Sequence, residues 1–96
     1  MTFEWDENKN QINIEKHGIS FEEAEGVFYD EDALLRDDPD HSEDEDRFIL
    51  LGFSLQAHLL VVVHCYRDDD NVIRIISARE ATKNESKQYI DRRWGW

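Results

Sequence analysis

The first apolar pattern along the chain has the period of an α-helix. Its members are Phe21, Ala24, Val27 and Phe28. This spacing predicts an amphipathic helix over residues 21–29, and residues 20–23 carry the capping-box pattern that starts a helix. Before it, Asp6 suits a helix N-cap and Gly18 suits a C-terminal glycine, so we expect a short helix over residues 3–18. The chain is therefore predicted to begin with two helices joined as a hairpin.

After the second helix the pattern changes to that of β-strands. Runs rich in apolar and β-branched residues, separated by polar turns, occupy residues 33–35, 47–53, 58–66 and 72–78. The segment from Leu59 to Val63 is apolar at every position, which is typical of a central strand covered on both faces. A tight polar turn at 68–71 predicts a hairpin between the last two strands. Ser77 and Glu80 form another capping box, so we expect a third helix from Ala78 to about Arg93.

These elements follow the order ααββββα. They predict one α+β domain over residues 1–96, with a four-stranded, mainly antiparallel sheet, two N-terminal helices and one C-terminal helix. The lone cysteine, Cys65, excludes an intrachain disulfide and disfavours a cysteine-based zinc site. No export leader is expected, and the longest apolar run is far too short for a membrane span, so we expect a cytoplasmic protein without a membrane partner.

The charge of the chain is divided unevenly between its two halves. The formal net charge is −12, yet residues 1–46 hold 17 acids against three bases and residues 47–96 hold six acids against eight bases. The halves therefore carry −14 and +2. Such asymmetry suggests a basic partner for the first half and an anionic partner for the second, with a merely solvated acidic surface as the alternative. The acidic segment 37–46 lacks the ligand spacing of an EF-hand, so we interpret it as a loop that docks a basic partner rather than as a cation site.

Polar and cationic side chains gather where the last strand passes into the last helix. They are Arg74, Ser77, Arg79, Lys83, Lys87 and Tyr89. Strand alternation places Arg74 and Ser77 on opposite faces, and helical spacing places the three cations from residue 79 to residue 87 on one side of the helix. Two explanations of that cationic side stay open. An anion could lie along it, or Glu80 and Glu85 could neutralise it internally.

The histidines offer less distinct chemistry. His58 and His64 share one face of the central strand with Tyr66, but six strand residues span about 20 Å, too far for one metal ion. We interpret one as half-buried and the other as an edge residue. His17, at the end of the first helix, is either a helix-terminal cation or a residue for proton transfer.

Four stretches in this order resemble the BrnT toxin family. They are residues 3–9 (FEWDENK), 13–24 (NIEKHGISFEEA), 37–42 (DDPDHS) and 72–82 (VIRIISAREAT). The resemblance implies a RelE-like ribonuclease fold and the toxin half of a type II toxin–antitoxin pair. It further implies a DNA-binding antitoxin of the BrnA type as partner, an assembly in which an antitoxin dimer bridges two toxins, and inhibition of translation. RNA would be cut without a metal or other cofactor, by attack of a 2′-hydroxyl on the adjacent phosphate.

The resemblance also assigns roles to residues. The matching candidates for catalysis are Lys9, His17, Arg67, Arg74 and Arg79, and those for RNA binding are Lys83, Lys87 and Tyr89. Lys9 or His17 would move protons, while Arg74 and Arg79 would hold the phosphate. Tyr89 would stack on a base.

The sequence departs from the family pattern in two ways. Glu80 stands where many relatives carry a basic residue, and the whole chain is strongly acidic. A second hypothesis is therefore a weak or inactive protein that only binds the antitoxin. A third, a metal enzyme using His41 and the nearby carboxylates, would require activity that EDTA abolishes.

Overall fold

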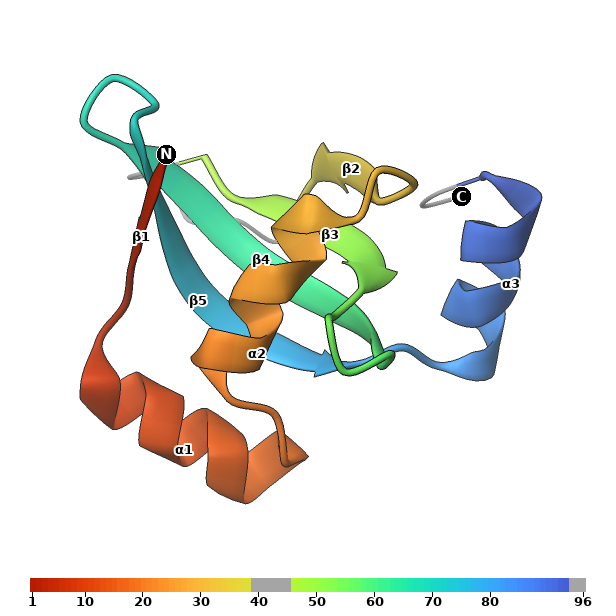
Figure 1. Cartoon of the computed structure of the whole chain (residues 1–96), viewed down its shortest axis with the longest axis horizontal. Helices are drawn as coiled ribbons and strands as arrows, with labels where there is room; N and C mark the ends of the chain where they lie inside the picture. The colour runs from red at the N-terminus through yellow and green to blue at the C-terminus, as the bar shows by residue number, and fades with distance from the viewer. Residues whose placement is uncertain (39–45, 94–96) are drawn as a thin grey trace.

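The computed structural model describes residues 1–38 and 46–93. In chain order its elements are β1 (Thr2–Glu4), α1 (Glu7–His17), α2 (Phe21–Glu25), the 3₁₀ helix η1 (Gly26–Tyr29), β2 (Leu34–Asp37), β3 (Phe48–Phe53), β4 (Leu59–Arg67), β5 (Val72–Glu80) and α3 (Lys83–Asp91). Within the described ranges the strands form one sheet in the order β1-β5-β4-β3-β2. β1 runs parallel to β5, and the other neighbours are antiparallel. Figure 1 shows α2 crossing one face of the sheet, α1 beside it, and α3 set apart.

The predicted α+β class is confirmed, but the sheet has one strand more than expected. Phe3 and Glu4 were expected to open the first helix, and instead they belong to β1, which pairs with Val72–Arg74. The helix starts only after Asp6, whose Oδ1 accepts the Asn8 N–H at 2.8 Å. It ends at Gly18, which has the left-handed φ of 73° and donates its N–H to the carbonyl of Ile14. Both predicted capping residues, Asp6 and Gly18, are therefore confirmed, while residues 2–4 ahead of Asp6 belong to the sheet.

The second helix begins where its capping pattern placed it. Ser20 Oγ accepts the Glu23 N–H at 3.0 Å. The α-helix ends at Glu25, however, and the expected remainder is the 3₁₀ turn η1. Gly26 lies at this change, against the β3–β4 turn, where a side-chain Cβ would meet Leu55 at 3.1 Å.

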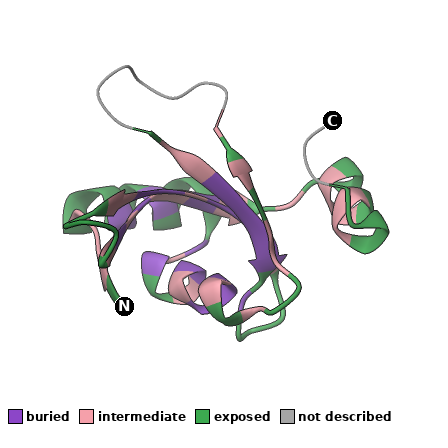
Figure 2. Cartoon of the chain, turned by 90° about the horizontal axis from the view of Figure 1, so that it is seen from above, coloured by how far each residue is buried: buried purple, intermediate pink, exposed green. Residues whose placement is uncertain are grey.

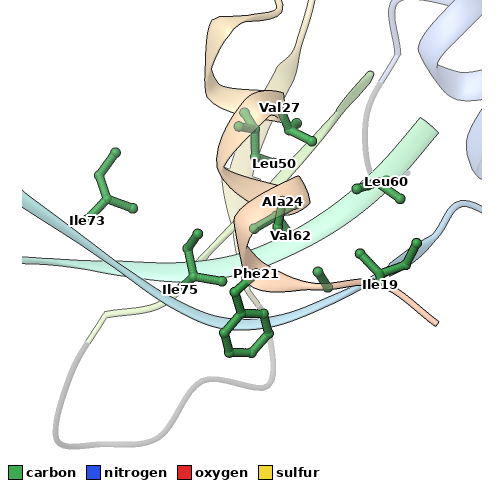
Figure 3. Close-up of a cluster of buried hydrophobic side chains, with 10 residues drawn as sticks. Ile19, Phe21, Ala24, Val27, Leu50, Leu60, Val62, Ile73 and Ile75 are labelled. Atoms are coloured by element: carbon green, nitrogen blue, oxygen red, sulfur yellow. The ribbon is translucent and has the colours of Figure 1, made fainter. Parts of the chain in front are cut away.

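The main core lies between α2, η1 and one face of the sheet, which we call the helix face. Its sheet residues include Leu60, Val62, Ile73 and Ile75, and Figure 3 shows them in one cluster with Phe21. On the opposite face, a smaller cluster of Ile49, Leu51 and Val61 packs with Tyr89 of α3. Leu60, Val61 and Val62 of β4 are buried, so this strand is covered on both faces, as its unbroken apolar run predicted. Figure 2 shows buried residues in the sheet and in the helices next to it, and none in α3, which is set apart.

The C-terminal helix starts later than expected. Glu80 still pairs with Leu60, so the expected helical residues 78–80 are the end of β5. Thr82 caps α3 instead: its Oγ1 accepts the Glu85 N–H at 3.1 Å, and the Glu85 carboxylate accepts the Thr82 N–H at 2.9 Å. The predicted capping box at Ser77 and Glu80 is therefore wrong, because sheet pairing with β4 takes those residues.

Two buried asparagines tie α1 to the rest of the fold. Asn13 Nδ2 donates to the carbonyls of Ile19 and Ala78, both at 2.8 Å, and its Oδ1 accepts the Ala78 N–H at 3.2 Å. Asn10 Oδ1 accepts the Phe21 N–H at 2.8 Å. Asn13 thus satisfies the backbone of β5 beyond the last residue that β1 pairs with. In the part of the chain that the structure describes, no helix is long and apolar enough to cross a membrane.

Candidate functional site

Arginines from four places along the chain share the sheet face opposite α2. They are Arg36, Arg47, Arg67, Arg74 and Arg79, and we call this surface the arginine face. Three of them follow from the pairing register, in which Arg36 lies opposite Ile49, Arg74 opposite Cys65 and Arg79 opposite Val61. Arg67 and Arg47 follow from strand alternation along β4 and β3. Arg47 lies just before β3, where the Asp38 N–H bond to its carbonyl continues the pairing of β2 with β3.

A β-bulge brings Arg74 and Arg79 to the same face. His64 pairs with Ile75 and Val63 with Ser77, so Ile76 has no opposite residue. Two residues five apart on a regular strand point to opposite faces, and one extra residue reverses that relation. The expectation that Arg74 and Ser77 lie on opposite faces is wrong for the same reason. The bulge therefore places two guanidinium groups where regular alternation would have separated them.

Glu4 lies between two of these arginines. Its Oε2 accepts a hydrogen bond from Arg74 Nη1 at 2.8 Å and lies 3.8 Å from Arg67 Nε. The parallel pairing of β1 with β5 sets Glu4 directly beside Arg74. The side chains of Glu4, Arg67 and Arg74 are 41%, 47% and 31% exposed, so a solvent molecule or an anion can reach them.

Arg79 is held by α3. Its Nη1 and Nη2 donate to the two carboxylate oxygens of Glu85 at 2.8 and 2.9 Å, a bidentate pair. The hydrogen bonds with Glu85 raise the pKa of Arg79, and those with Arg79 lower the pKa of Glu85. Of the two acids expected to neutralise the cations, Glu85 does so with its carboxylate, whereas Glu80 offers Arg79 only its main-chain carbonyl, at 3.3 Å.

The remaining C-terminal candidates lie on α3. Because Arg79 belongs to β5, the expected helical row of three cations is reduced to Lys83 and Lys87, both exposed. Lys87 pairs with Asp91 at 3.3 Å. Tyr89 docks the helix: its hydroxyl donates to Asp30 Oδ2 at 2.8 Å and its ring packs edge-on against Phe53.

Asp30 is the acceptor on which this docking depends. Its Oδ2 also accepts the Phe53 N–H at 2.8 Å, and Oδ1 accepts the Asp32 N–H at 2.9 Å. Burial would raise the pKa of Asp30, but the hydrogen bonds outweigh burial and leave the pKa below its usual value. Burial, followed by the bond to Asp30, raises the pKa of Tyr89 to about 12.

Lys9 and His17 lie on the exposed surface of α1. Among the described residues, the structure records no ion pair or side-chain hydrogen bond for either. α1 meets the sheet through Asn13 at Ala78, and the structure gives no contact between these two candidates and the arginine face. Arg67 and Arg74 are the candidates that the structure brings together, through Glu4.

The histidines of the sheet serve the fold. His64 is fully buried, and burial lowers its pKa to about 4, so it is neutral at physiological pH. His58 is exposed and its Nδ1 lies 2.7 Å from Glu23 Oε2, which also accepts a bond from Ser54 Oγ at 2.6 Å. Over residues 1–38 and 46–93, no group of three or more His, Cys, Asp or Glu side chains is placed to hold a metal ion. His41 and most of the acidic segment lie outside the described residues.

Three residues of this surface were not anticipated: Glu4, Arg36 and Arg47. A signal for Glu4 was available, because Phe3, Glu4 and Trp5 alternate apolar, polar and apolar as in an edge strand. Arg36 and Arg47 flank the acidic segment. They share a face because of the β2–β3 register, which the local sequence does not predict.

The fold and this surface define an α+β protein with α2 and η1 on one sheet face, and the arginines and α3 on the other. Residues 5–85 match the family described as "Ribonuclease toxin, BrnT, of type II toxin-antitoxin system". The match spans most of the chain, so the chain belongs to the BrnT toxin family, as the sequence motifs predicted.

A solved structure supports the same assignment. The ribonuclease toxin BrnT of Brucella abortus, known from a 1.1 Å crystal structure, is 25% identical in sequence and superposes with a TM-score of 0.63. The alignment covers 86% of this chain and 99% of that one. No curated protein matched the chain.

Proposed function

We propose that this chain is an endoribonuclease toxin that binds the RNA backbone on its arginine face. The observation that carries the proposal is the bulge at Ile76, which sets Arg74 and Arg79 on one open surface together with Arg67. Guanidinium groups match phosphate oxygens in bidentate geometry and stabilise the charge that develops on a phosphorane. Membership of a ribonuclease toxin family gives the chemistry such a surface would serve.

The proposed reaction needs no metal ion or cofactor. A 2′-oxygen attacks the adjacent phosphorus, the bond from phosphorus to the 5′-oxygen breaks, and a 2′,3′-cyclic phosphate and a 5′-hydroxyl result. A base takes the proton of the 2′-hydroxyl, and an acid gives a proton to the leaving 5′-oxygen. Lys9 and His17 are the proton-transfer candidates from the family motif. Glu4 is a further candidate base, because its carboxylate already touches Arg74 on the proposed phosphate surface.

The contacts of the arginines also favour a second function. Arg74 binds Glu4 and Arg79 binds Glu85, so an RNA phosphate has to displace or join a carboxylate at each position. Together with the net charge of −12, these pairs favour a weakly active or inactive protein that serves to bind its antitoxin. The two functions share a partner and differ only in RNA cleavage.

We further propose the setting that the family implies. The partner is a DNA-binding antitoxin of the BrnA type, which bridges two toxins, and the protein acts in the cytoplasm, where RNA cleavage inhibits translation. Lys83 and Lys87 extend the RNA surface along α3. Tyr89 serves there mainly by holding α3 in place, since its hydroxyl and ring edge are already engaged.

Expression in a bacterial host without the antitoxin tests the proposal. Wild type is expected to arrest growth, and Arg74→Ala or Arg79→Ala is expected to relieve the arrest. Arg93→Ala, which removes an exposed arginine outside the arginine face, is the matched control and should remain toxic. Circular dichroism should show that each variant folds. A harmless wild type that cleaves no RNA, yet still binds the antitoxin, would establish the second function instead.

A further inference from the structure

A pocket opens at the end of the sheet where β4 turns into β5. It has a volume of about 440 Å³ and is lined by Met1, Asp46, Phe48, Tyr66 and Asp70. β1 begins beside this turn, where the Thr2 N–H donates to the carbonyl of Asn71 at 3.3 Å. Figure 1 shows the N-terminus beside this turn. Neither the proposed reaction nor the family motifs use this pocket.

Two aromatic rings of the pocket lining, Phe48 and Tyr66, pack against each other and against the buried His64 ring. The rings of Phe48 and Tyr66 pack edge to face with their centroids 5.3 Å apart. The buried His64 ring supports both, at 6.1 Å from Phe48 and 5.3 Å from Tyr66, and its Nε2 lies 3.3 Å from the Tyr66 hydroxyl. The lining is therefore preorganised, so little ordering is needed when a ligand binds.

The charged groups around the rings are mainly acidic. Asp46 and Asp70 contribute carboxylates to the lining, and Asp68 and Asp69 continue the exposed turn. Burial first, and then the nearby charge of Asp70, raises the pKa of Tyr66. Met1 also lines the pocket. Arg67, next to Tyr66 in sequence, points to the arginine face by alternation.

We propose that this pocket receives an arginine or lysine side chain from a basic segment of a partner protein. Carboxylates beside aromatic rings favour a cation with an apolar stem, because charge pairing and cation–π attraction act together. RNA is disfavoured here, since the carboxylates repel phosphate and the arginine face lies on the other side of the sheet. That the partner is the antitoxin rests on the proposed function, whereas the preference for a cation follows from the pocket alone.

Nuclear magnetic resonance titration with an acetylated, amidated tetra-arginine peptide tests the proposal. We expect amide shifts centred on the pocket, binding that weakens with added salt, and at least about fivefold weaker binding after Asp46→Asn with Asp70→Asn. The matched control, Glu15→Gln with Glu31→Gln, removes two exposed carboxylates elsewhere and should bind within about twofold of wild type. Tyr66→Phe keeps the ring and should bind, while Tyr66→Leu should bind more weakly.

Three results would overturn the proposal. The shifts could centre elsewhere, the control pair could weaken binding as much as the pocket pair, or guanosine monophosphate could bind at these residues more tightly than the peptide. The titration needs no RNA cleavage. A failure here is therefore distinct from a failure of the growth assay.

Discussion

Asn13 joins three parts of the fold through one buried amide. Its side chain bonds the carbonyl of Ile19, which precedes α2, and both backbone groups of Ala78 in β5. Asn13→Ala would remove all three hydrogen bonds while preserving the helical backbone. The groups left without a partner are backbone groups of Ala78 and Ile19. These residues are only 1% and 3% exposed, so water reaches the groups poorly.

The expected cost follows from those unsatisfied groups. A buried donor or acceptor without a partner costs about 1–3 kcal/mol, and three neighbouring groups relax together rather than additively. Alanine has the higher helix propensity, which returns about 0.5 kcal/mol. We therefore expect the free energy of unfolding to fall by about 3 kcal/mol, which for a domain of this size lowers Tm by more than about 10 °C.

Urea unfolding followed by circular dichroism measures this change. Asn8→Ala is the matched control, because Asn8 is exposed on the same helix and gains the same helix propensity. It should change the free energy of unfolding by less than about 0.5 kcal/mol. If Asn13→Ala were as stable as Asn8→Ala, the hydrogen bonds of Asn13 to Ile19 and Ala78 would contribute nothing to stability. The claim that Asn13 holds α1 against β5 would then be wrong.

Two further predictions concern buried positions. The pKa of His64 is lowered by burial to about 4, so between about pH 6.5 and pH 4 the unfolded chain binds this proton and the folded chain does not. The free energy of unfolding should therefore fall by about 3 kcal/mol between pH 6.5 and pH 4, and His64→Phe should flatten this part of a pH series of urea titrations. A Cβ at Gly52 would meet Ala33 Cβ at 2.8 Å and Asp30 Oδ2 at 3.0 Å, so Gly52→Ala should lower the free energy of unfolding by about 1–3 kcal/mol. A thermal melt of Gly52→Ala that matched wild type would show that the segment holding Asp30 and Ala33 moves away at no cost.

Features of the fold that depend on neighbouring residues were predictable from the sequence. Asp6, Gly18 and Ser20 act as caps because each bonds backbone only two to four residues away. The β4–β5 hairpin follows from its polar turn, and its close pairing needs no distant information. Local chemistry was sufficient at these positions.

The features that failed depend on pairing across the chain. β1 is three residues long and acquires its strand conformation from β5, about 70 residues later. The Ser77–Glu80 and Thr82–Glu85 capping patterns are both acceptable locally, and only the pairing of Glu80 with Leu60 selects the second. The bulge left one trace, the adjacent apolar pair Ile75 and Ile76, which breaks the alternation of β5.

In the candidate site, too, local sequence predicted some features, while others depend on pairing between distant segments. The cationic residues were identifiable by type, but their grouping was not, because the bulge determines which of them share a face. Arg79 was expected on a helix and lies on a strand. Glu4 was missed because its neighbour, Arg74, is 70 residues away in sequence.

Cleavage of a labelled RNA in the presence of EDTA tests the central claim most directly. After the cleavage position is mapped, the same RNA is prepared with a 2′-deoxy nucleotide there. We predict that wild type cuts the all-ribose RNA to leave a 2′,3′-cyclic phosphate and does not cut the deoxy-substituted RNA at that position. Arg74→Ala and Arg79→Ala should each slow the cut by about 100-fold or more, while Arg93→Ala should not. Cleavage of the deoxy-substituted RNA at the same position, or equal rates for wild type and both arginine variants, would contradict the account.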